Sequence, residues 1–143
     1  MIGLIVTGHG KFASGLASAL NLIAGPQKNF YAIDFEGDET PSELEVHLRQ
    51  AFEELKECNG IIVYSDLPGG TPFKTSVMLS LEYPNTHVIS GTNLPMLCEM
   101  ALVRSFEDDV NVLAQKTIYT GQEQVVKYEM KHVSPANNLK DGI

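Results

Sequence analysis

The chain has 143 residues, of which 43% are hydrophobic and 20% are charged, and its formal net charge is -8. This length suits a single domain with an ordinary core, and the composition excludes a disordered chain. Because the acidic balance leaves no basic stripe to neutralise phosphodiesters, a nucleic-acid partner is disfavoured.

Short apolar runs alternate with stretches of helical periodicity, a pattern typical of a parallel sheet built from βαβ units. We expect strands at residues 2–7, 30–35, 60–65 and 87–90, and helices at 12–24, 41–56, 72–81, 95–105 and 109–119. The second helix has the clearest start, because Thr40 can act as N-cap, Pro41 fits the first helical position and Glu43 completes a capping box. In the fourth helix, the spacing of Met96, Leu97 and Met100 indicates core or interface positions.

The end of the chain changes character twice. Between residues 125 and 133, Val126, Tyr128 and Met130 alternate with charged residues, which predicts a further strand at an edge of the sheet. Residues 134–143 are polar and turn-rich, so we expect a flexible tail after one domain of residues 1–133.

The two cysteines bear on metal binding, and the apolar runs and the amino-terminal sequence bear on cellular location. Cys58 and Cys98 stand apart and lack the spacing of metal ligands, so we expect reduced thiols, no metal and no cofactor. No apolar run reaches the roughly 18 residues of a membrane span. The amino terminus also lacks the basic and small-residue features of a secretory signal. We therefore expect a soluble, cytoplasmic protein.

Three polar or glycine-rich loops follow predicted strands: Gly8-His9-Gly10, residues 66–73 and residues 91–96. In a parallel sheet these loops meet at the carboxyl edge, where open α/β folds place their ligand chemistry. A neutral imidazole such as that of His9 is a nucleophile and a proton carrier near pH 7. If the first and third strands are neighbours, Asp66 accepts the Nδ1 proton of His9 and leaves Nε2 with the lone pair.

The same loops can accommodate an anion. Their glycines permit the close approach of a bulky group: Gly8, Gly10, Gly69 and Gly70. We expect the helix that follows His9 to offer unpaired backbone N–H groups, and Thr71 to add a hydroxyl donor. Together these features predict a site for a phosphoryl group on His9 that requires neither a metal nor a cofactor.

Each of these residues also has an ordinary structural explanation. A lone histidine in a turn is more often structural than catalytic, and Asp66 can simply cap its own turn. Pro68 and the neighbouring glycines are common turn residues. Lys11 and Arg104 are possible phosphate contacts, although residues of these types are more often solvated at the surface.

Four motifs in order give the chain a specific resemblance to the IIA domain of the mannose-family sugar phosphotransferase system of bacteria. They are Ile-Val-Thr-Gly-His-Gly at 5–10, Ile-Asp-Phe at 33–35, Asp-Leu-Pro-Gly-Gly-Thr-Pro-Phe at 66–73 and Gly-Thr-Asn-Leu-Pro-Met-Leu-Cys-Glu at 91–99. The resemblance extends over about the first 130 residues. Pro68 and Thr71 stand where the family often carries Trp and Ser, and Thr71 keeps the hydroxyl.

The resemblance implies a function, partners and a fold. His9 would be phosphorylated on Nε2 by the carrier protein HPr and would pass the group to the IIB component, with Asp66 as the acidic partner of the imidazole. The membrane components IIC and IID would be indirect partners. The fold would be α/β, an open, mainly parallel sheet of four parallel strands plus one antiparallel C-terminal edge strand, flanked by helices. Family members are homodimers that exchange this edge strand, which residues 125–133 would supply.

Three other functions remain open at this point. Gly8, Gly10 and Ala13 fit a dinucleotide-binding fingerprint after a strand, with Asp34 at the end of the next strand. A metal-free hydrolase that uses His9 and Asp66 is a second possibility, although no nucleophile-elbow serine accompanies them. A purely structural dimer module is the third.

Overall fold

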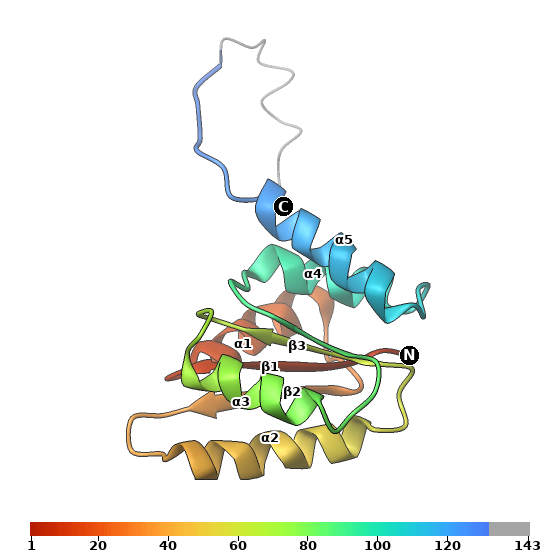
Figure 1. The fold of residues 1–143 in the computed structure, drawn as a ribbon. Coiled ribbons are helices and arrows are strands. Elements are labelled where there is room, and N and C mark those ends of the chain that lie inside the picture. The colour runs from red at the N-terminus through yellow and green to blue at the C-terminus, as the bar shows by residue number, and fades with distance from the viewer. Residues whose placement is uncertain (132–143) are drawn as a thin grey trace.

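The computed structural model describes residues 1–131, and they form one α/β unit (Figure 1). Its four strands are β1 (Gly3–His9), β2 (Phe30–Phe35), β3 (Ile61–Ser65) and β4 (Thr86–Ile89), which pair in parallel in the order β2-β1-β3-β4. Its five helices are α1 (Phe12–Ala24), α2 (Pro41–Leu55), α3 (Thr71–Ser80), α4 (Leu94–Val103) and α5 (Val110–Glu123). Within residues 1–131, no helix combines the length and apolarity needed to cross a membrane.

The sheet is covered on both faces, as its central strands predict. Figure 1 shows α2 and α3 on one side, and α1, α4 and α5 on the other. Residues of β1 alternate between two apolar clusters: Leu4 and Val6 pack with α1, α4 and α5, whereas Ile5 packs with α2. Burial on both faces explains why β1 and β3 are almost continuously apolar.

The sequence patterns locate the strands and helices well. The four strands predicted for the parallel sheet and all five predicted helices are present; β2 and α1 have the predicted bounds and the others differ at their ends, with α5, predicted to end at residue 119, continuing to Glu123. The capping box of α2 is confirmed, because Glu43 N–H donates to Thr40 Oγ1 at 3.2 Å and Thr40 N–H donates to Glu43 Oε1 at 3.0 Å. Met96 and Met100 are buried in the core as expected.

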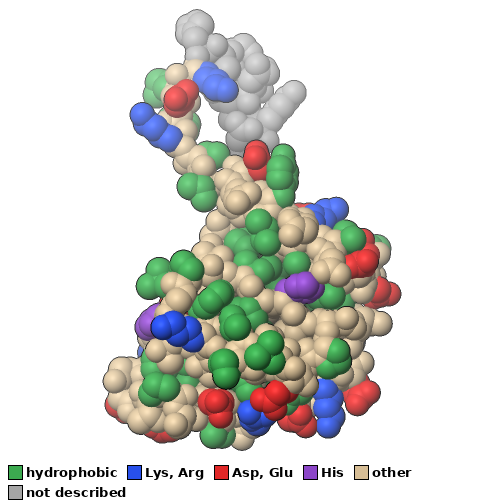
Figure 2. Space-filling view, in the orientation of Figure 1, with side chains coloured by type: hydrophobic (Ala, Val, Ile, Leu, Met, Phe, Trp, Pro, Cys, Tyr) green, Lys and Arg blue, Asp and Glu red, His purple; other side chains and the backbone are tan. Residues whose placement is uncertain are grey.

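The antiparallel edge strand is a wrong prediction for the described part of the chain. Residues 125–131 form no strand there; they leave the end of α5 as an exposed extension (Figures 1 and 2). Residues 132–133, and the tail predicted at 134–143, lie outside the described residues. Alternation of apolar and polar residues predicts a strand but supplies no partner, and a strand requires a neighbour to bond its backbone groups.

Arg104 also differs from expectation, because it is neither a phosphate contact nor a solvated surface residue. Its side chain is buried, and the residue is only 3% exposed. The guanidinium donates to the carbonyl of Ile2 at 3.1 Å and to those of Lys28 and Asn29. These bonds tie the loop before β2 to the amino end of β1, at the opposite end of the strand from His9.

Candidate functional site

The candidate site lies where the strand order reverses. From β1 the chain crosses to β2 on one side, and from β3 it crosses to β4 on the other, so the switch point lies between β1 and β3. Such a point leaves a crevice at the carboxyl ends of the two strands. His9 is the last residue of β1, and Asp66 follows the last residue of β3.

The structure brings the two predicted residues together. His9 Nδ1 lies 2.7 Å from Asp66 Oδ2, and the same oxygen accepts the His9 main-chain N–H at 2.8 Å. The His9 side chain is 46% exposed, whereas that of Asp66 is only 11% exposed. With Asp66 ionised, Nδ1 carries the proton and donates it, so Nε2 holds the lone pair on a ring that solvent reaches.

The environment of Asp66 favours its ionised form. Burial alone would raise the pKa of this carboxyl, but the hydrogen bonds from His9 N–H, the His9 ring and Leu67 N–H outweigh it, and the pKa of Asp66 lies below its usual value. The carboxylate is therefore charged at neutral pH. It is placed to stabilise positive charge on the imidazole.

Two glycines are required by the packing around this pair. A Cβ on Gly8 would lie 2.4 Å from Phe12 Cδ1 and 3.0 Å from Asp66 Cγ. A Cβ on Gly70 would lie 2.8 Å from His9 Cε1 and 3.5 Å from His9 Nε2. Gly70 therefore lies against the Nε2 edge of the ring, where a side chain would displace the imidazole.

Two further glycines serve the backbone. Gly10 and Gly69 have φ angles of 60° and 80°, in the left-handed region that glycine adopts at low cost. A Cβ on either would meet no atom within 4 Å. Their role at the site is thus to allow the two turns, whereas Gly8 and Gly70 allow close approach.

The helix that can receive an anion differs from the one expected. In α1, which follows His9, Ser14 N–H donates to Asp34 Oδ1 at 2.9 Å, so a carboxylate already occupies that helix start. In α3, by contrast, the N-cap is Gly70 and no side chain caps the helix. The first N–H groups of a helix have no intrahelical partner; in α3 these belong to Thr71, beside His9 Nε2, and to Phe73, because Pro72 between them has no N–H.

The hydrogen bond from Ser14 N–H to Asp34 also argues against the dinucleotide-binding hypothesis. In that fold the pyrophosphate sits at the amino end of the first helix, but here the Asp34 carboxylate caps that end. An acidic group there would repel a pyrophosphate. Among residues 1–131, no group of three His, Cys, Asp or Glu side chains is arranged to hold a metal ion.

Comparison with known proteins identifies the family. The family model "PTS system fructose IIA component" matches residues 3–118. The chain belongs to this family. The fructose-specific EIIA component of Bacillus subtilis is 29% identical over 140 residues, which cover 96% of this chain and 94% of that protein.

Two further relatives of the family define how far the likeness extends. The mannose-specific EIIAB component of Escherichia coli K12 is 27% identical over 94% of this chain, which spans only 42% of that longer protein. The crystal structure of a phosphotransferase component EIIA from Streptococcus agalactiae has a TM-score of 0.82 at 37% identity, over 89% of this chain and 97% of that one. The chain is therefore a phosphotransferase-system IIA component of the mannose and fructose type.

Proposed function

We propose that this protein is a phosphohistidine carrier for sugar uptake, in which His9 accepts a phosphoryl group from phosphorylated HPr and passes it to the IIB component. The membrane components IIC and IID would then use the group, and the relay would operate in the cytoplasm. The observation that carries the proposal is the 2.7 Å contact between His9 Nδ1 and Asp66 Oδ2. It leaves Nε2 as the nucleophile on a half-exposed ring.

The proposed chemistry exchanges one N–P bond for another. The Nε2 lone pair attacks phosphorus in line with the bond to the donor imidazole; the new N–P bond forms as the donor bond breaks, and the donor keeps that electron pair. Positive charge develops on the His9 ring, and the Asp66 carboxylate stabilises it through Nδ1–H. Transfer to IIB reverses the same steps with His9 as the leaving group.

The phosphoryl group on Nε2 would lie against the start of α3. Gly70 leaves room at this edge of the ring, because a Cβ there would come within 3.5 Å of Nε2. The N–H groups of Thr71 and Phe73 and the Thr71 hydroxyl would donate to the phosphoryl oxygens, and the positive end of the helix dipole favours negative charge. Gly8, Gly10 and Gly69 complete the site by shaping its two turns.

As part of the same proposal, two copies form a homodimer through their C-terminal segments. The extension carries four strongly exposed apolar side chains (Figure 2): Val125, Val126, Tyr128 and Met130. A hollow beside it is lined by Ile89 at the end of β4, Met96 of α4 and Ile118 of α5. An extension from a second copy could pair with the open edge of β4 and bury both apolar surfaces.

The function is tested by labelling. The protein is incubated with labelled phosphoenolpyruvate, the kinase that uses it and HPr. Acid-labile, alkali-stable label is expected on the natural protein and none on a His9→Ala variant, whose fold should persist because the replaced side chain is half exposed. A His47→Ala variant, which also removes a half-exposed imidazole, is the matched control and should label normally. Label that survives loss of His9, or its absence from the natural protein, refutes the proposal.

A further inference from the structure

The edge of the sheet formed by β2 is open over its whole length. β2 pairs only with β1 among the described strands. Leu4 N–H donates to the carbonyl of Asn29, and Gly10 N–H to that of Phe35, so the odd-numbered residues along β2 direct their backbone groups to β1. Because these directions alternate along a strand, the N–H and C=O groups of Phe30, Ala32 and Asp34 point away from the sheet.

A groove runs along this edge between β2 and α2. It consists of two adjoining hollows of about 580 and 340 Å³ that share Ile33 and His47. Consecutive residues line it, with Ala32 and Ile33 among them, although neighbours along a strand face opposite sides of the sheet. The groove therefore follows the backbone edge itself, and its size suits a chain segment rather than a water molecule of about 30 Å³.

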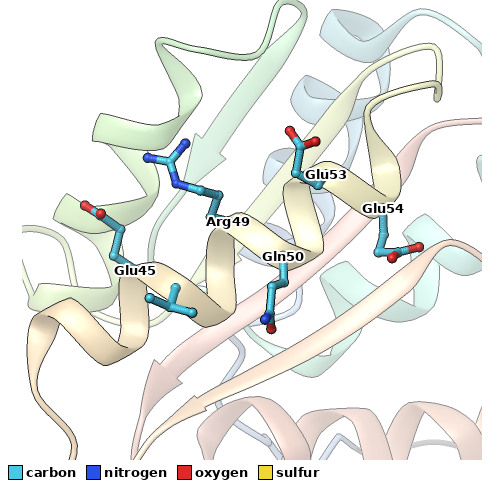
Figure 3. A pocket seen from close by; sticks show the side chains of 6 residues that line it. Glu45, Arg49, Gln50, Glu53 and Glu54 are labelled. Carbon is cyan, nitrogen blue, oxygen red and sulfur yellow. The ribbon is translucent and has the colours of Figure 1, made fainter.

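The α2 wall of the groove is polar. Gln50 and Glu54 line both the groove and the neighbouring hollow on α2. Figure 3 shows these two side chains on one side of α2, and Arg49 on the other, where its guanidinium pairs with Glu82 at 2.8 Å. Arg49 is thus held away from the groove.

The groove is acidic on balance. Glu36 and Glu39 line the end nearer His9 and Glu54 lines the other end, whereas Asp34, which also lines the groove, directs its carboxylate to Ser14 N–H of α1. Two basic side chains lie beside these acids. Lys11 Nζ is already paired with Glu36 Oε1 at 2.8 Å, and His47 Nδ1 lies 3.4 Å from Glu39 Oε2.

We infer that this groove binds an extended, basic segment of a partner protein, which adds to β2 as a further strand. Backbone groups at Phe30, Ala32 and Asp34 would bond the segment, and alternate lysine or arginine side chains would face the acids. The acids argue against the β2 edge of a second copy as occupant, because that edge carries the same charges, and the C-terminal extension of a second copy is assigned to the β4 edge. The inference stands apart from phosphoryl transfer, which uses other residues.

The test uses the whole protein and a short fluorescent peptide of alternating lysine and valine, with a glutamate–valine peptide as the control. Fluorescence anisotropy measures affinity, and backbone amide NMR locates the binding. We expect the basic peptide alone to bind, with larger amide shifts at Ala32 and Asp34 than at Tyr31 and Ile33. No binding, equal binding of both peptides, or shifts centred on His9 or β4 overturns the inference.

Two variants sharpen the test. Ala32→Pro removes one outward N–H without removing a bond to β1, so at least tenfold weaker binding is expected in a folded protein. Glu54→Lys should weaken binding by about two- to fivefold. If the proline variant does not fold, unchanged binding by Glu54→Lys overturns the inference. Glu123→Lys, the same change at an exposed position of α5, is the matched control and should bind as the natural protein does.

Discussion

Replacing Gly70 with alanine tests the geometry around His9 more sharply than removing His9 itself. The backbone of Gly70 has φ -71° and ψ 166°, which any residue adopts, so alanine fits there without strain. The new Cβ, however, would lie 2.8 Å from His9 Cε1, whereas an ordinary contact begins at 3.4 Å. The imidazole and the backbone at residue 70 must therefore separate, by 3.4 - 2.8 = 0.6 Å if an ordinary contact is to be restored.

The size of the effect follows from this displacement. A misplacement of about 1 Å can cost about 100-fold in rate, and a hydrogen bond to a charged group contributes about 1.5–3 kcal/mol. At about 1.36 kcal/mol per tenfold, loss of the Nδ1 contact to Asp66 corresponds to about 10- to 150-fold. We expect the rate of phosphoryl transfer from phosphorylated HPr to fall about 10- to 150-fold, and the free energy of unfolding to fall by up to about 3 kcal/mol because the same contact is lost.

Gly69→Ala is the matched control, because it should lose stability without losing transfer. At φ 80° an alanine is strained by about 1–2 kcal/mol, but its Cβ meets no atom within 4 Å. Quenched-flow labelling measures the transfer rate, and urea unfolding measures stability. The reasoning is refuted if the Gly70→Ala variant transfers at the natural rate, or if the Gly69→Ala variant loses as much transfer.

Three other predictions concern the His9–Asp66 pair, the hydrogen bonds of Arg104 to the amino end of β1, and the C-terminal extension. Because the pKa of Asp66 is lowered, its contribution to stability is present above the ordinary value of 3.8 and lost as the pH falls through the lowered pKa. The stability gap between the natural protein and Asp66→Asn should thus close in acid urea titrations, and a gap independent of pH would contradict this. Arg104→Met leaves buried carbonyls unpaired and should cost about 3 kcal/mol of unfolding free energy without changing the transfer rate; a slower transfer would place Arg104 in the site after all. A chain ending at Gln124 should sediment as a monomer, and a dimer would refute exchange through the extension.

The sheet and the central pair of site residues could be predicted because each depends on local pattern and simple topology. Continuous apolar runs gave β1 and β3, and the glycine-flanked end of β1 placed His9 at the carboxyl edge. Once β1 and β3 are neighbours, Asp66 must lie near His9. The capping box of α2 is equally local, since Thr40 and Glu43 satisfy each other.

The features that sequence missed depend on contacts between distant segments. Nothing near Asp34 in the sequence indicates that its carboxylate caps α1, because Ser14 lies 20 positions earlier. Likewise, Arg104 bonds the carbonyl of Ile2 across 102 positions, which no local pattern encodes. The strand predicted after α5 rests on alternation of apolar and polar residues alone, and a strand needs a hydrogen-bonding partner that this pattern does not supply.

The central claim is that phosphorus bonds to Nε2 of His9 while Nδ1 stays engaged with Asp66. Two-bond proton–nitrogen NMR of the histidine rings, recorded before and after phosphorylation by HPr, tests it most directly. We predict that the Nε2 resonance of His9 alone shifts to that of a phosphorylated nitrogen and that Nδ1 keeps its proton. Phosphorus on Nδ1, or on any other histidine, would contradict the account.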